Sequence, residues 1–542
     1  MLAAPAATAA AMHRFALALL FLPALLACQK PAPAATADAA TVQAPDVIEA
    51  DIASLQQAMA KGTLTSQALV QAYLARIAAI DDAGPTLNAV IEVNPDAYED
   101  AAALDAERKA GRVRGPLHGI PVLLKDNIDA RPMVNSAGSL AMAQHRPQAD
   151  AFMVARLRDA GAVILGKTNL SEWANFRGNQ SSSGWSSRGG QTLNPYALDR
   201  SPCGSSSGTG SAIAASLASV GIGTETDGSI ICPAAVAGLV GIKPTVGLVS
   251  RSGVIPIAAS QDTPGPMART VADAAALLGV IAGNDPSDTH GVLPGRPATP
   301  PSYSAGLRRD ALAGARIGVL RDNLGKQPDV DAAFERALAT LKAQGAVLVD
   351  ARIPTAGRWN DAEFQVLLYE FKDGLNRYLA ANQAPVRDLA ALIAWNSTHA
   401  SQVLPHFGQE LLEQAQAKGP LSEPAYLKAR ADARRLAGPE GIDAALAAQR
   451  LDALVAPAMS PPWKTDHARG DAFSFAGYGV AAVAGTPSIT VPMGDAAGLP
   501  LGLVFLGPAW SEAKLIGLAY AFEQASQARK PPRFAASAAL AR

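Results

Sequence analysis

Apolar positions along the chain fall at two spacings, and each spacing predicts its own elements. The segment that begins at Ser66 carries apolar side chains at helical spacing, with Thr65 or Ser66 as its cap. Short apolar runs predict strands at 120–124 and 162–165, and the segment between them predicts a helix over 151–160. Strands that alternate with helices favour a mixed or parallel sheet with helices on both faces.

The rest of the chain repeats both patterns. The further predicted elements are helices at 211–220, 271–281 and 330–344, a strand from 316, and strands at 453–456, 488–492 and 501–505. Residues 359–450 are mainly helical. Because strands occur on both sides of this region, we expect an α/β fold. It is one large domain with a mixed, mostly parallel central sheet, helices on both faces and a helical insertion.

Composition excludes several classes of function. The 542 residues carry a formal net charge of −1, which gives no electrostatic footprint for nucleic acid. Cys28, Cys203 and Cys232 are the three cysteines, and neither C-x-x-C nor H-E-x-x-H spacing occurs, so no metal site is predicted. Phosphate-loop and dinucleotide motifs are also missing from the sequence, and we expect no cofactor.

The N-terminal residues indicate export. A basic start after Met12 and a short apolar stretch predict a signal peptide over 1–28, with Met12 as the better-proportioned start. Leu25-Leu26-Ala27-Cys28 resembles the lipobox of bacterial lipoproteins, in which the cysteine is lipidated; an ordinary cleaved signal is the alternative. Residues 29–45 predict an Ala/Pro-rich tether, and 46–535 the folded domain. We therefore expect a periplasmic protein held to the outer membrane by a lipid at Cys28, with no other membrane contact.

One lysine and two serines carry the candidate chemistry. Lys125 ends an apolar run, and burial there would favour its neutral amine, which is a base. Ser205 and Ser229 lie 24 residues apart in a glycine- and serine-rich stretch. A base near two hydroxyls can activate a nucleophile, so the sequence predicts a serine hydrolase. The alternatives are a solvated lysine, a flexible turn around Ser205 and a helix cap at Ser229.

Other motifs compete with this interpretation. Residues 204–208 satisfy G-x-S-x-G with Ser206 as nucleophile, but that elbow needs a preceding strand, and 194–202 is polar and broken by prolines. Ser511 and Lys514 match S-x-x-K without its companion motifs, which indicates a helix start. His118 precedes the Lys125 strand and is a weak candidate for the pocket wall.

Three spaced motifs resemble the amidase signature family. They are Gly-Ile-Pro-Val-Leu-Leu-Lys over 119–125, Cys-Gly-Ser-Ser-Ser-Gly over 203–208 and Gly-Thr-Glu-Thr-Asp-Gly-Ser over 223–229. The stretches Gly-Ile-Lys-Pro-Thr-Val-Gly from 241, Gln-Asp-Thr-Pro-Gly-Pro-Met-Ala-Arg from 261 and Ala-Gly-Thr-Pro-Ser-Ile-Thr-Val-Pro from 484 extend the likeness over about residues 50–530. Within the family the chain is most similar to bacterial peptide amidases.

The resemblance implies a role for each matched residue. Ser229 would be the nucleophile, Ser205 a bridging proton carrier that follows a cis peptide bond from Gly204, and Lys125 the general base. Backbone N–H groups of Thr226, Asp227, Gly228 and Ser229 would form the oxyanion hole. The chain has Glu225 and Asp227 where most members have Asp and Gly, and the Asp227 carboxylate would lie near developing negative charge unless it is turned away.

The resemblance also implies an activity. We expect an amidohydrolase that converts carboxamides to carboxylate and ammonia, with C-terminal amides of peptides as substrates. The alternatives are an amidase of small aliphatic or aryl acylamides, a glutamine-hydrolysing component of a transamidosome, and a tethered solute- or peptide-binding lipoprotein. We expect a monomer, and the segments 173–176 and 367–378 either line the pocket or belong to the core. Cys203 and Cys232 flank the two serines, and free buried thiols are favoured over a disulfide.

Overall fold

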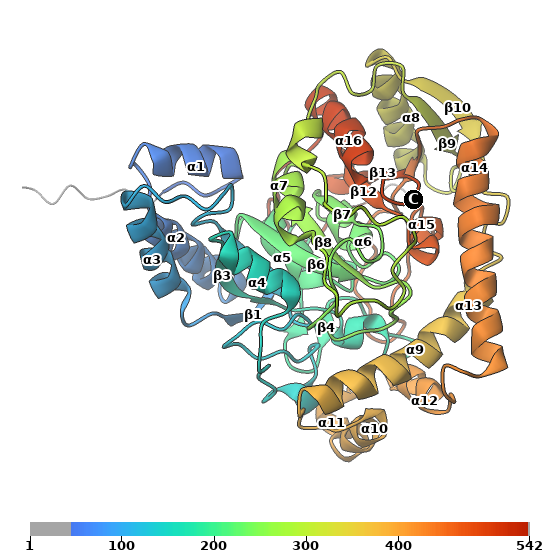
Figure 1. Cartoon of the computed structure of the whole chain (residues 1–542), viewed down its shortest axis with the longest axis horizontal. Helices are drawn as coiled ribbons and strands as arrows, with labels where there is room; N and C mark the ends of the chain where they lie inside the picture. The colour runs from blue at the N-terminus through green and yellow to red at the C-terminus, as the bar shows by residue number, and fades with distance from the viewer. Residues whose placement is uncertain (1–44, 540–542) are drawn as a thin grey trace, which may run out of the picture. The chain divides into compact units, whose positions relative to one another are not determined.

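A sheet of eleven strands runs through residues 45–539, which are the residues that the computed structural model describes (Figure 1). The predicted signal over 1–28 and nearly all of the tether over 29–45 lie outside these residues. The strands of the sheet, in spatial order, are β1 (Val90–Val93), β3 (Val163–Thr168), β2 (Pro121–Lys125), β6 (Val220–Glu225), β8 (Thr263–Ala268), β7 (Val240–Lys243), β12 (Ser488–Ala496), β13 (Leu499–Leu506), β11 (Ala453–Pro457), β9 (Arg316–Leu320) and β10 (Val347–Ala351). A separate two-stranded sheet joins β4 (Trp185–Ser186) and β5 (Gly190–Gln191).

The sheet is mixed, as the sequence predicts. Parallel pairs form two blocks, β3–β2–β6 and β11–β9–β10. Antiparallel pairs join the strands between these blocks and add β1 at the outer edge of the first block. The side chains of β2, β3 and β6 are buried throughout, as expected for parallel strands covered on both faces.

Helices cover both faces of the sheet. On one face α4 (Phe152–Asp159), α7 (Val271–Ile281), α16 (Glu512–Ser526) and α8 (Pro328–Ala343) follow one another in contact. On the other face α5 (Ser207–Ala214) and α6 (Ile231–Val236) contact each other and the central strands (Figure 1). These two short helices begin directly after the two serine-bearing segments, so this face of the sheet positions both serines.

The remaining helices form a group near the start of the described chain and a run that follows β10. They are α1 (Ile52–Ala60), α2 (Ser66–Arg76) and α3 (Ala97–Lys109), then α9 (Asn360–Ala381), α10 (Leu389–Thr398), α11 (Ala400–Val403), α12 (Glu410–Gln416), α13 (Pro424–Ala437), α14 (Asp443–Ala448) and α15 (Gly479–Ala484). The run from α9 to α14 is the predicted helical insertion, and α9 packs against α12 and α13 (Figure 1). All described residues fall in one compact unit, and none of their helices has the length and apolar character needed to cross a bilayer.

The structure differs from the local predictions at several points, and β1, β7 and β10 are strands that were not predicted. The helix predicted at 211–220 is wrong, because α5 already ends at Ala214 and Val220 begins β6. No strand was predicted over β8, which contains Pro264 and Pro266 yet pairs with β6. Proline lacks an N–H and is usually confined to sheet edges, so its presence there hides a central strand from pattern analysis.

Candidate active site

Lys125 lies at the end of β2 with no exposed surface. Its Nζ is hydrogen-bonded to Ser205 Oγ at 2.7 Å, to Thr224 O at 3.1 Å and to Thr224 Oγ1 at 2.9 Å. Asn127 Nδ2 also donates to the Thr224 hydroxyl, over 3.0 Å. Lys125 and Ser205 are therefore in direct contact, as the sequence predicts.

The environment of Lys125 favours the neutral amine. Burial lowers the pKa of Lys125 to about 7, against smaller opposing effects of Asp262 and Glu225. Among the described residues no carboxylate is hydrogen-bonded to Nζ, whose three bonds all lead to uncharged oxygens. A neutral amine has one lone pair, and a hydroxyl such as that of Ser205 can donate its hydrogen to it.

Ser205 and Ser206, the two candidate serines in the segment before α5, have different surroundings. The peptide bond between Gly204 and Ser205 is cis, and Ser205 is fully buried against Lys125. Ser206 Oγ donates to Thr224 O over 3.1 Å and accepts the N–H of the same residue over 3.2 Å. Because Ser206 is fully buried and engaged in both roles, the geometry opposes the alternative in which it is the nucleophile.

Ser229 lies between β6 and α6 and reaches the cavity surface. Its carbonyl accepts the N–H of Ser206 over 3.2 Å, which joins the two serine-bearing segments. Cys203 and Cys232 join the same segments by a disulfide, with a Cα–Cα distance of 6.0 Å. The expectation that these two cysteines are free thiols is therefore wrong. Sequence spacing indicated their proximity but not the orientation of their side chains, which decides whether a bond can form.

The turn from Thr226 to Ser229 offers unpaired backbone donors. Within the described residues the N–H groups of Thr226, Asp227 and Ser229 donate to no protein atom. Glu225 holds the end of the turn, because its Oε2 accepts the N–H groups of Ile230 and Ile231 over 2.8 and 2.9 Å. Donors fixed in this way can stabilise an oxyanion, which is the role that the resemblance implies for this turn.

Asp262 fixes the start of the same turn. The carboxylate accepts the Thr226 hydroxyl over 2.5 Å and the N–H groups of Ile257 and Ala258 over 2.8 and 2.9 Å. Gln261 adds a bond from its Nε2 to Thr226 O at 3.4 Å. Burial raises the pKa of Asp262 to about 6, although these bonds oppose the shift.

A cavity of about 700 Å³ opens onto this turn. Gly204, Thr226, Asp227 and Ser229 line it, together with apolar and aromatic side chains. The residues of the two predicted wall segments that line it are Ala174, Asn175, Phe176 and Leu367. Other residues of those segments do not reach the cavity: Trp173 is buried, and Tyr378 donates its hydroxyl to Asp129.

The Asp227 side chain faces the cavity rather than turning away from it. Burial raises the pKa of Asp227 well above its usual range, and Glu363 and Glu225 raise it further. The side chain is nevertheless exposed to the open cavity, where solvent screens its charge from a developing oxyanion.

The other candidates lie elsewhere. His118 is fully buried and does not line the cavity. Its Nε2 is hydrogen-bonded to Leu104 O over 3.0 Å. Ser511 precedes α16 and Lys514 pairs with Asp452, so this motif is the predicted helix start. Over residues 45–539 no group of three or more histidine, cysteine, aspartate or glutamate side chains is arranged to hold a metal ion.

Sequence reasoning missed three contributors to the site. Thr224 and Asp262 fall inside motifs that the resemblance used, but nothing in those motifs showed that they contact Lys125 and Thr226. Glu363 lies at the first turn of α9 and lines the cavity. No sequence motif indicated that Glu363 belongs to the site, because only the folding of the helical insertion brings it to the cavity.

The chain is similar in sequence and fold to known amidases. The family model described as Amidase matches residues 68–516. A crystal structure of a peptide amidase in complex with the competitive inhibitor chymostatin is 60% identical, with a TM-score of 0.88 over 90% of this chain and 99% of that one. The native peptide amidase of Stenotrophomonas maltophilia is also 60% identical, with a TM-score of 0.87 over the same shares of both chains.

More distant relatives carry other names. A "probable amidase" of Arabidopsis thaliana is 40% identical over 90% of this chain and 92% of its own length. One component of the glutamyl-tRNA(Gln) amidotransferase of Deinococcus deserti is 35% identical over 87% of this chain and 95% of its own length. A single family therefore covers most of the chain and includes more than one activity.

Proposed function

The chain belongs to the amidase family, and we propose that it hydrolyses the C-terminal carboxamides of peptides to carboxylate and ammonia. The likeness in sequence and structure to peptide amidases supports this substrate class over small aliphatic or aryl acylamides. The cavity of about 700 Å³, with its aromatic and apolar wall, offers room for residues beyond the reacting amide.

Ser229 attacks the amide carbon in this mechanism. Its proton passes to Ser205 Oγ, while the proton of Ser205 passes to the neutral Nζ of Lys125. The negative charge that develops on the carbonyl oxygen is held by N–H groups of the turn from Thr226 to Ser229, including those of Asp227 and Ser229. All of these groups come from one chain, so the reaction requires no second copy, and we propose a monomer.

The tetrahedral intermediate collapses by breaking its carbon–nitrogen bond. The leaving nitrogen takes a proton from Ser205, which recovers one from the Lys125 ammonium, and ammonia departs from the acyl ester of Ser229. Water then attacks the ester and gives its proton through Ser205 to Lys125. The second collapse returns a proton to Ser229 Oγ and releases the carboxylate.

The observation that carries this proposal is the 2.7 Å bond between buried Lys125 and Ser205. A positioned base with a pKa of about 7 is well matched to proton transfer near neutral pH. Ser205 is followed by Ser206, whose N–H donates to the carbonyl of the cavity-lining Ser229, so the Lys125–Ser205 pair belongs to a segment joined to that serine.

Ammonia release and active-site labelling test the mechanism. Lys125→Ala, provided that its circular dichroism spectrum is native, should lose nearly all ammonia release from a peptide amide. Ser229→Ala should abolish labelling by a fluorophosphonate, whereas Ser206→Ala should still be labelled. Full activity of Lys125→Ala would contradict the relay, and labelling that depends on Ser206 would restore the elbow alternative.

We also propose that the protein is exported and anchored through a lipid on Cys28. The lipobox-like sequence supports this location, and so does the disulfide between Cys203 and Cys232, because disulfides persist in oxidising compartments. In a bacterial host the wild-type protein should sediment with outer membranes, and Cys28→Ser should appear in a soluble fraction. Equal distribution of the two proteins would contradict the anchor.

A further inference from the structure

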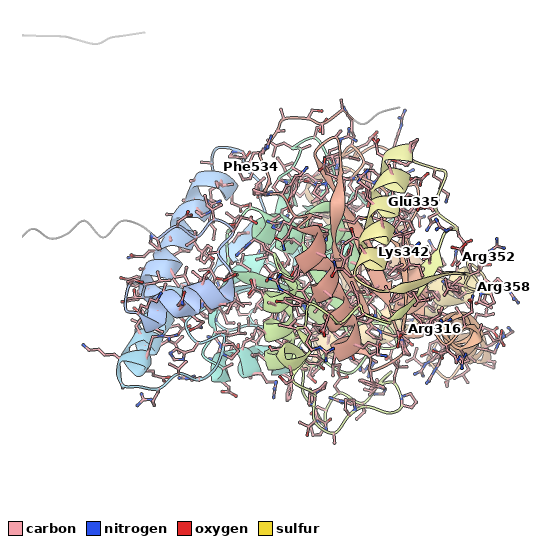
Figure 2. The ribbon with its side chains drawn as sticks, turned by 90° about the horizontal axis from the view of Figure 1, so that it is seen from above. Arg316, Glu335, Lys342, Arg352, Arg358 and Phe534 are labelled. Atoms are coloured by element: carbon pink, nitrogen blue, oxygen red, sulfur yellow. A yellow bond between two sulfur atoms is a disulfide. The ribbon has the colours of Figure 1, made fainter. Side chains whose placement is uncertain are left out.

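Carboxylates are the charged groups that line the active-site cavity. Asp227, Asp322, Glu363 and Asp471 all contribute to its wall, and no lysine or arginine of the described chain does. Two arginines near its rim, Arg352 and Arg358, are exposed, and their side chains point into solvent (Figure 2). The cavity is thus walled by apolar groups and negative charge.

The four carboxylates differ in how well they are paired. Asp471 accepts bonds from the backbone and hydroxyl of Ser183 and from Trp463, which accounts for its place in the structure. Glu363 is only 8% exposed, yet only its Oε1 has a partner, Gln261 Nε2 at 2.9 Å. Its Oε2 meets no donor among the described residues. Asp227 likewise accepts no side-chain hydrogen bond in that part of the chain.

Glu363 is largely buried and keeps one oxygen free for a donor from the cavity, whereas the Asp227 carboxylate is exposed to the cavity. Burial raises the pKa of Glu363 to about 7, and a cation bound beside it would favour the charged carboxylate. Of the cations in the fold, Lys243 acts on Asp227, but it is fully buried outside the cavity wall.

We propose that Asp227 and Glu363 bind a cationic group on the acyl residue of the substrate, a specificity that rests on the peptide-amide activity proposed above. Asp227 lies two residues before Ser229, so the cation must lie close to the reacting carbonyl. It is the basic side chain of the residue that carries the carboxamide, or the free α-ammonium of an amino-acid amide. Aromatic and aliphatic wall residues such as Phe176 and Leu367 cover the methylene stem of a basic side chain.

A set of matched substrates tests the proposal on the unmodified protein. Ammonia release is measured from N-acetylated dipeptide amides that end in lysinamide, norleucinamide or glutamic acid amide, and from lysinamide and norleucinamide with free α-amino groups. We expect kcat/KM for the acetylated lysine substrate to exceed that for norleucine about tenfold or more, with glutamate poorest. Free norleucinamide carries an α-ammonium but a neutral side chain, so its kcat/KM measures the effect of the α-ammonium alone.

Glu363→Gln and a control variant assign the effect to the cavity. Glu363→Gln keeps the bond to Gln261 possible and should reduce the preference for lysine over norleucine several-fold. Glu335→Gln is the control, since Glu335 lies on α8 outside the cavity wall and pairs with Arg321 at the surface (Figure 2). It should keep the wild-type preference.

Different results would overturn the cation site and the peptide-amide activity on which it rests. Equal kcat/KM for cationic and neutral substrates of both types, or the same preference in Glu363→Gln as in wild type, would overturn the cation site. Absence of ammonia release from every peptide amide, including the norleucine one, would overturn the peptide-amide activity itself.

Discussion

Thr226 donates its hydroxyl hydrogen to Asp262 over 2.5 Å. The same carboxylate accepts two backbone N–H groups of the segment at 257–258. Asp262 also acts on Lys125 through its charge, raising the pKa of the lysine. One buried carboxylate therefore links the oxyanion turn to the base, and two substitutions can separate these effects.

Asp262→Asn should lower kcat and shift its pH dependence. The turn loses a charged acceptor that holds Thr226, which we expect to cost about tenfold or more in kcat. Loss of the negative charge lets the pKa of Lys125 fall further below about 7, so the acidic limb of the profile should move to lower pH. The measurement is kcat for a neutral peptide amide across pH 5–9.

Thr226→Val is the matched variant. It removes the hydroxyl but leaves the Asp262 charge near Lys125, so kcat should fall while the midpoint of the acidic limb stays in place. If both variants shift the midpoint equally, Asp262 acts on the base through structure rather than through charge.

Protonation of Lys125 should govern the acidic limb of the wild-type enzyme. The mechanism needs the neutral amine, whose pKa is about 7, so kcat should fall about tenfold for each pH unit below 7 and level off above it. Saturating substrate is used because Glu363, also with a pKa raised to about 7, faces the substrate cavity. A profile that stays flat down to pH 5 would contradict a lysine base.

Lys125→Met should separate stability from activity. The folded state lowers the pKa of Lys125, so between about pH 7 and 10 the unfolded chain binds more protons than the native one. Stability supplied by this group therefore rises with pH, and burying it costs on the order of 4 kcal/mol at pH 7. Thr224 O keeps its bond from Ser206, so the variant should lose activity yet unfold at a higher temperature. A lower Tm at pH 7 would contradict this account.

The sequence predicted the parts of the site that depend on neighbours in the chain. Lys125 ends an apolar strand, and Ser205 and Ser229 each precede a helix on the same face of the sheet. Those features are local or carried by spaced motifs. The contacts of Thr224 and Asp262 arise only when β6 and β8 pair, and the prolines of β8 hid that strand.

The helical insertion also shows that the sequence predicts helices better than it predicts which of their residues reach the site. Its helices were predicted as a class from residues 359–450, but which residues face the site depends on how α9 packs. Leu367 and Glu363 line the cavity, whereas Tyr378, from the same helix, is buried beside Asp129. Helical periodicity gives faces of a helix, and tertiary packing decides which face meets the substrate.

The disulfide should contribute measurably to stability. Cys203 and Cys232 are 29 residues apart, and closing a loop of that length stabilises a protein by about 3–4 kcal/mol in the chain-entropy model. The double variant Cys203→Ser/Cys232→Ser should therefore unfold at lower urea concentration. Reductant should lower the wild-type midpoint toward that of the double variant and leave the double variant unchanged. Identical midpoints of the oxidised wild type and the double variant would contradict a stabilising role.

Gly228 should tolerate no side chain. Its φ is +82°, which an L-residue with a side chain rarely adopts, and an added Cβ would overlap the ring of Tyr478. Relief of this overlap would move the N–H groups of the turn, each of which is worth up to a few kcal/mol of transition-state stabilisation. We therefore expect Gly228→Ala to lose about a hundredfold or more in kcat.

The matched control is Gly279→Ala in α7, where an added Cβ meets nothing within 4 Å. That variant should keep wild-type kcat and gain about 0.5–1 kcal/mol in free energy of unfolding, because alanine favours a helix over glycine. Wild-type kcat in Gly228→Ala would show that the turn at 226–229 does not hold the oxyanion.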